Sequence, residues 1–122
     1  YFAGDWFARL KIPFRHTGNA MSAQEISALS AGIDLEALRG YRVAVGRRTR
    51  ELVTALDESE YKRRVDESRL ARVLAEGALS ESAREIAAYW GKRTISGLLL
   101  MPATRHNFLH LNECLRLKAK KA

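Results

Sequence analysis

Two of the three histidines in this chain, His106 and His110, lie four residues apart near its end. The stretch around them, MPATRHNFLHLNECLRL, has the apolar spacing of a helix. Residues four apart on a helix share one face, about 5–6 Å from each other, so both imidazoles can reach a single ion. Neutral imidazole suits zinc, nickel, copper or iron. On spacing alone, a metal-binding role and a purely structural role both stay open.

Two ligands do not make a tight site, because a catalytic zinc centre needs about three protein ligands and one open position. Glu113 and Cys114 lie one turn beyond His110 and are further candidates. His16, the remaining histidine, stands in a loop-like stretch beside Arg15 and is a candidate third ligand or an ordinary loop residue. The pair lacks the glutamate of an HExxH motif, which would serve as general base, so a metallopeptidase is disfavoured.

The elements that position these residues should all be helices, since apolar residues recur at helical spacing almost throughout the chain. We expect helices at residues 1–11, 22–31, 35–56, 60–64, 69–76, 82–90 and 95–118. Pro102 falls inside the last of these and lacks the N–H that an α-helix needs, so this helix should kink or restart there. The predicted fold class is therefore all-α.

Short polar motifs mark where the helices begin and end. Ser22 with Glu25, and Ser82 with Glu85, have the spacing of a capping box. Asp34 and Thr94 are expected N-caps of the helices that follow them. We expect two glycines, Gly32 and Gly77, to end the helices that precede them, Gly32 in a left-handed conformation.

Composition limits the class of protein further. The 122 residues suit a single domain, residues 1–122, and the single cysteine excludes an internal disulfide framework, so we expect a cytoplasmic protein. No apolar run approaches the ~20 residues that span a bilayer. The net charge of +7 would suit nucleic acid, but the basic residues are spread along the chain among acidic ones. Without a recognisable DNA- or RNA-binding motif, nucleic acid is an improbable partner.

The segment YWGKRTISGLLLMPATRHNFLHLNECLRL, residues 89–117, resembles the C-terminal half of the DinB-like family, the DinB/YfiT-like metal-dependent enzymes. WFARL, near the start of the chain, resembles the end of that family's second helix. The resemblance implies a four-helix bundle in up-down-down-up order with a long central connection. It also implies a divalent metal, zinc or nickel, held by three histidines, two of which correspond to His106 and His110.

The third histidine of the family would precede Tyr1, together with the family's first helix. Three explanations stay open: a truncation upstream of Tyr1, which we favour, a substitution by His16, or an incomplete metal site. The resemblance further implies a metal-dependent hydrolase or a thiol (S-)transferase that acts on a small molecule, with a low-molecular-weight thiol as cosubstrate. Arg93 and Arg105 are candidate residues for binding an anionic cosubstrate.

Two other functions remain as alternatives. One is a non-enzymatic helical homodimer with an incomplete metal site, which would bury apolar surface left open by a missing helix. The other is a basic, DNA-associated stress protein, suggested by the net charge. Bound metal that is lost on replacing His106 and His110 would distinguish the metal-dependent protein from both.

Overall fold

The computed structural model describes residues 3–120, without the side chains of residues 3, 102 and 103. Within that range the chain forms helices and no strand, which confirms the predicted all-α class. The α-helices are α1 (Trp6–Leu10), α2 (Ala23–Gly32), α3 (Leu35–Thr54), α4 (Glu67–Ala75), α5 (Arg84–Gly91), α6 (Ile95–Leu100) and α7 (His106–Ala119). Three short 3₁₀ helices, η1 (Ala3–Asp5), η2 (Glu58–Lys62) and η3 (Glu81–Ala83), and a π-helical turn, η4 (Met101–Arg105), join them.

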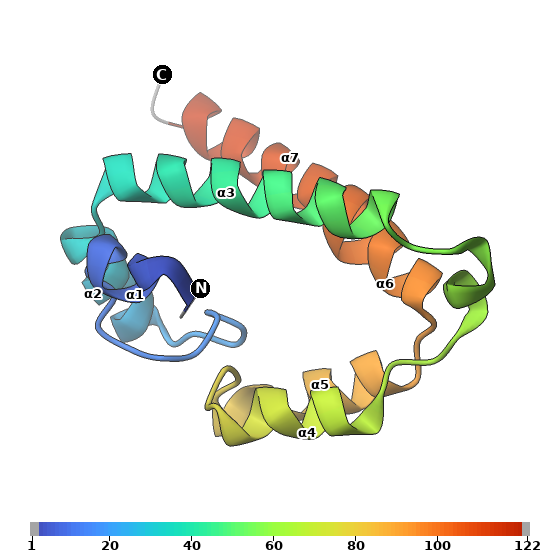
Figure 1. The fold of residues 1–122 in the computed structure, drawn as a ribbon. Helices are drawn as coiled ribbons and strands as arrows, with labels where there is room; N and C mark the ends of the chain where they lie inside the picture. Colours follow the sequence, from blue (N-terminus) through green and yellow to red (C-terminus); the bar gives the residue numbers. More distant parts are fainter. Residues whose placement is uncertain (1–2, 121–122) are drawn as a thin grey trace.

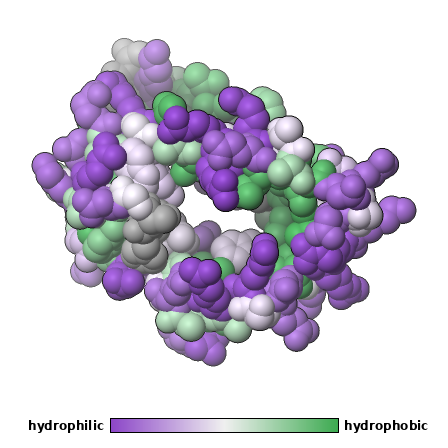
Figure 2. Space-filling view, viewed as in Figure 1, coloured by the Kyte–Doolittle hydropathy of each residue, from purple (hydrophilic) through white to green (hydrophobic). Residues whose placement is uncertain are grey.

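The helices are arranged as an open ring (Figure 1). α3 and the α6–α7 segment run side by side in opposite directions along one edge, and α4 and α5 pack together along the opposite edge. The loop after α1 meets the loop after α4, where the Thr17 N–H and hydroxyl both donate to the Ala78 carbonyl, each at 2.9 Å. The space-filling view shows an opening at the centre of the ring, with hydrophobic surface along one side of it (Figure 2).

The N-caps of α2, α3 and α6 form as the sequence predicts. Ser22 and Glu25 make a complete capping box, in which the Glu25 carboxylate accepts from the Ser22 N–H at 2.8 Å. The Asp34 carboxylate accepts from the Ala37 N–H at 2.9 Å and begins α3, the longest helix in the described range. The Thr94 hydroxyl accepts from the Gly97 N–H at 3.2 Å and begins α6. These caps are local, so sequence alone locates them.

Two of the predicted helix ends are wrong. Gly32 is the last residue of α2 and is not left-handed, because Ile33 follows in an extended conformation that leads directly into the Asp34 cap. Ser82 does not cap α5, because it lies inside the 3₁₀ helix η3, which begins at Glu81. Its hydroxyl is 2.9 Å from the hydroxyl of Ser80. Gly77 does adopt the left-handed conformation after α4, with φ of 67°.

The buried part of the molecule is small and divided. One cluster lies between α4 and α5, where Leu79, Ala83 and Ala87 are buried. The other lies where α1 meets α3, around Leu10, which is 1% exposed. By contrast, α3 and α6–α7 expose large apolar side chains: Leu35, Leu38, Val43, Leu52, Leu100, Phe108, Leu109, Leu111, Leu115 and Leu117. The long edge of the ring therefore carries most of the exposed apolar surface of the described residues.

No helix in the described range is long and apolar enough to cross a membrane.

Candidate functional site

The π-helical turn η4 sets where the histidine pair begins. Pro102 cannot donate a backbone hydrogen bond, so α6 ends at Leu100 and the chain passes through a wider turn before α7 starts at His106. The His106 N–H donates to the Met101 carbonyl, five residues back, and the Thr104 hydroxyl donates to the Leu100 carbonyl at 2.6 Å. The predicted interruption at Pro102 is confirmed. Both histidines then belong to one regular helix.

The two imidazoles of the pair face each other. The Nε2 atoms of His106 and His110 lie 2.9 Å apart, and the rings meet edge to face at 82°. The other nitrogen of His110, Nδ1, lies 2.8 Å from a carboxylate oxygen of Glu113. We call these three residues the His106–His110–Glu113 cluster. Its members are all exposed to solvent.

The hydrogen bonds of the cluster define a consistent protonation pattern. An ionised carboxylate only accepts, so the neutral His110 ring donates from Nδ1 to Glu113. Its Nε2 then carries a free lone pair and accepts a hydrogen bond from the Nε2–H of His106. Glu113 thus orients His110 as carboxylates orient metal-binding histidines in known sites, with the lone pair directed away from the carboxylate.

This arrangement fits two ligands of a divalent metal ion. Nitrogens that share one tetrahedral zinc at 2.0–2.1 Å are about 3.3 Å apart, so the present spacing needs to open by only a few tenths of an ångström. For His106 to bind through Nε2, its ring hydrogen would have to lie on Nδ1 instead, so that both rings bind as neutral imidazoles. Among the described residues, however, no group of three or more His, Cys, Asp or Glu side chains could hold an ion. His106 and His110 can therefore fill two of the four positions around a tetrahedral ion.

His16 lies in another part of the fold and is engaged there. Its Nδ1 accepts from the Gly18 N–H at 3.2 Å, so Nε2 carries the hydrogen and donates to the Glu25 carboxylate at 3.0 Å. The ring stacks on Phe14 with 4.4 Å between centroids. The bond to His16 and, more strongly, those to Ser22 hold the pKa of Glu25 below its ordinary value. In this structure His16 fixes the loop before α2 and is not brought to the pair.

Of the two predicted arginines, Arg93 is placed apart from the pair, and Arg105 adjoins the pair on another side of the helix. Arg93 lies over the ring of Tyr89 at 4.2 Å, before the start of α6 and about 17 Å of helix from His106. Arg105 is exposed and precedes His106, about 100–140° round the helix from the two imidazoles. Cys114 is exposed and free.

A groove that the sequence analysis did not predict lies between α3 and α6–α7. Its volume is about 670 Å³, within the range of small-molecule sites. Its walls are mainly apolar, and no acidic side chain lines it: the residues are Arg42, Val45, Gly46, Thr49, Leu52, Val53, Leu56, Arg63, Arg69, Ile95, Leu98, Leu99 and Asn107. Only the helical spacing of apolar residues in α3 hinted at this surface, because the groove needs elements that are far apart in sequence.

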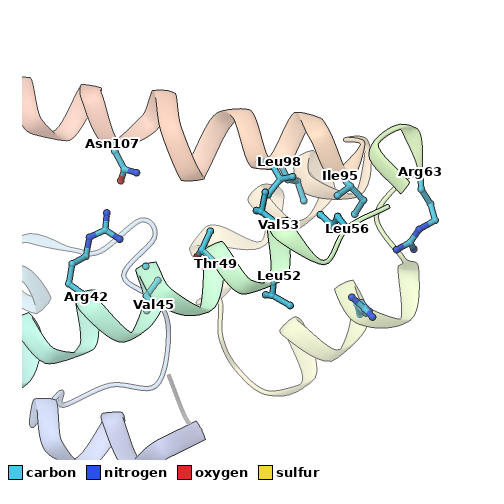
Figure 3. A pocket seen from close by; sticks show the side chains of 13 residues that line it. Arg42, Val45, Thr49, Leu52, Val53, Leu56, Arg63, Ile95, Leu98 and Asn107 are labelled. Atoms are coloured by element: carbon cyan, nitrogen blue, oxygen red, sulfur yellow. The ribbon is translucent and has the colours of Figure 1, made fainter. Parts of the chain in front are cut away.

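Three arginines give the groove its charge. Figure 3 shows Arg42 of α3 directed toward Asn107 of α7, with Val53 and Leu98 farther along the groove. Arg42 makes no salt bridge in the described structure, whereas Arg63 pairs with Glu60 at 2.7 Å. Because Asn107 follows His106 directly, the Arg42 end of the groove is the end that adjoins the histidine pair along α7.

Comparison of the chain with protein-family models, with curated proteins and with solved structures finds no match.

Proposed function

We propose that this protein binds a divalent metal ion, zinc or nickel, through His106 and His110, as a DinB-like metal-dependent protein. The observation that supports this most directly is the 2.9 Å approach of the two Nε2 atoms, with Glu113 bonded to the far nitrogen of His110. A purely structural role explains this pair less well, because both imidazoles are exposed and neither packs into a core.

The proposed reaction class is hydrolysis or thiol transfer on a small molecule. When bound, a divalent ion supplies Lewis acidity that activates a water molecule or a low-molecular-weight thiol. The residues of the chain have separate tasks. Glu113 holds His110 in the tautomer whose Nε2 lone pair is available, and His106 would bind as the tautomer that carries its hydrogen on Nδ1.

The groove supports a substrate with an apolar body and an anionic group. Its apolar walls exclude water from such a body, and Arg42 offers an unpaired cation at the end nearest the histidines. Arg42 therefore takes the role for which the sequence suggested Arg93 and Arg105. A carboxylate-bearing thiol satisfies both requirements.

We also propose a finer architecture for this protein, a four-helix bundle of the DinB/YfiT type. Two long helical segments with exposed apolar side chains, α3 and α6–α7, supply two of the helices that such a bundle requires. The exposed apolar side chains of α7 also favour the alternative of a non-enzymatic homodimer, which would bury them without any chemistry.

The test is elemental analysis of protein purified without a histidine tag and incubated with zinc or nickel. We expect bound metal in the unaltered protein and in an Asn112→Ala control, which changes an exposed residue elsewhere on α7. We expect none in the His106→Ala, His110→Ala double variant, whose helix content should be unchanged by circular dichroism. A metal-free unaltered protein, or equal metal in the double variant, would refute the proposal.

A further inference from the structure

The histidine pair fills only half of a tetrahedral coordination shell, and the rest of that shell faces solvent. The side chains of His110 and Glu113 are 57% and 55% exposed. Within residues 3–120 no additional His, Cys, Asp or Glu side chain completes a three-ligand group. A tetrahedral ion at this position therefore needs two more donors from outside the described chain.

The face of α7 that carries the pair is open to the approach of another helix. Within α7, Asn107 is of intermediate exposure, and the other residues are exposed. Leu117 lies within about 20° of His110 on the helical wheel, and Leu109 within about 60° of His106. These leucines are 61% and 56% exposed. The imidazoles are thus flanked by apolar side chains that a packed helix would cover.

We propose that a second copy of this chain supplies the missing donors, so that one metal ion joins two α7 helices through His106 and His110 of each. The inference rests on the proposed function, because it uses the same two imidazoles as ligands. A twofold axis through the ion makes the contact isologous, the commonest arrangement in homodimers. Two nitrogens from each copy give the four ligands of a closed tetrahedral site. Such a site has no open position, so the inference keeps the proposed metal binding and gives the ion a structural role in place of the proposed reaction.

Charge selects the antiparallel arrangement of the two helices. The end of α7 is basic, with Arg116, Lys118 and Lys120. Lys118 lies about 15 Å along the helix from the midpoint of the histidine pair, so antiparallel copies hold these ends about 30 Å apart. That separation exceeds the screening length of about 8 Å at physiological salt. A parallel pair would instead bring the basic ends together.

Glu113 should position His110 in this joint site. Its carboxylate fixes the Nδ1–H of His110 and adds one negative charge per copy beside the ion. Removal of such a carboxylate partner typically lowers metal affinity 10–100-fold. The Glu113→Gln variant, which keeps an acceptor oxygen but loses the charge, should therefore need about 10–100 times more zinc to dimerise.

The experiment combines analytical ultracentrifugation with metal counting, using zinc chloride as the probe. We expect zinc to convert monomers to dimers that hold one zinc per two chains, and a chelator to reverse this. Asn112→Ala should dimerise as the unaltered protein does, and His110→Ala should stay monomeric in zinc.

Other outcomes overturn the inference in distinguishable ways. Monomers that hold one zinc per chain would overturn the joint site and leave the proposed function standing. A protein that binds no zinc would overturn both. Dimers that persist in chelator and in the His106→Ala, His110→Ala variant would show an interface that does not depend on metal.

Discussion

Two glycines inside α3 should respond in opposite ways to replacement by alanine. Alanine is favoured over glycine in a helix interior by about 0.8–1.0 kcal/mol, because glycine loses more backbone freedom on folding. A Cβ atom added at Gly46 would meet no atom within 4 Å, so the Gly46→Ala variant should realise this gain. At about 4 °C per kcal/mol for a chain of this size, its midpoint of thermal unfolding should rise by about 4 °C.

At Gly40 the same change meets the indole of Trp6. The added Cβ would lie 3.3 Å from a ring carbon of Trp6, which is tighter than ordinary contact. The ring has little room to retreat, because the Arg9 guanidinium lies 4.0 Å from its centroid and the Tyr41 ring lies 5.6 Å away. Overpacking of this kind costs about 1–3 kcal/mol, so Gly40→Ala should be neutral or destabilising by up to about 2 kcal/mol.

Urea and thermal unfolding followed by circular dichroism would measure both variants. If Trp6 is the cause, Gly40→Ala should become stabilising in a Trp6→Leu background, as a double-mutant cycle would reveal. Equal stabilisation by Gly40→Ala and Gly46→Ala in the unaltered background would refute the packing of α1 against α3 described above.

The remaining predictions concern the core and the pH dependence. Leu10→Ala removes the largest wholly buried side chain among the described residues and should cost about 2–5 kcal/mol in urea unfolding. The exposed Leu117→Ala should change stability by less than about 0.5 kcal/mol, and similar losses in the two variants would contradict the burial of Leu10. Acid should destabilise the protein, because hydrogen bonds from Ser22 and Ala37 hold the pKa values of Glu25 and Asp34 below their ordinary values. Stabilisation by such carboxylates is complete above the ordinary range and is lost as protons bind, so the urea midpoint should be flat above about pH 5 and fall toward pH 3. Asp34→Asn keeps a capping oxygen and should weaken that fall; an unchanged profile would argue against the Asp34 contribution.

Features that depend on neighbouring residues were predictable from the sequence. The Ser22–Glu25 capping box, the Asp34 and Thr94 caps and the interruption at Pro102 form as expected, because each needs only backbone groups within a turn or two. The predicted cap at Ser82 does not form, because Ser82 already lies inside the 3₁₀ helix η3 that precedes α5.

The candidate site also has one part that was predictable from local sequence and another that was not. Sequence alone determined that His106 and His110 share a face of one helix, since the 3.6-residue period fixes this whatever the surroundings. Only the tertiary structure decided that His16 bonds Glu25 instead of joining the pair, and that Arg42, Arg63 and the α6 leucines border one groove. Those juxtapositions depend on how separate helices close into a ring, through packing and loop contacts that no local pattern encodes.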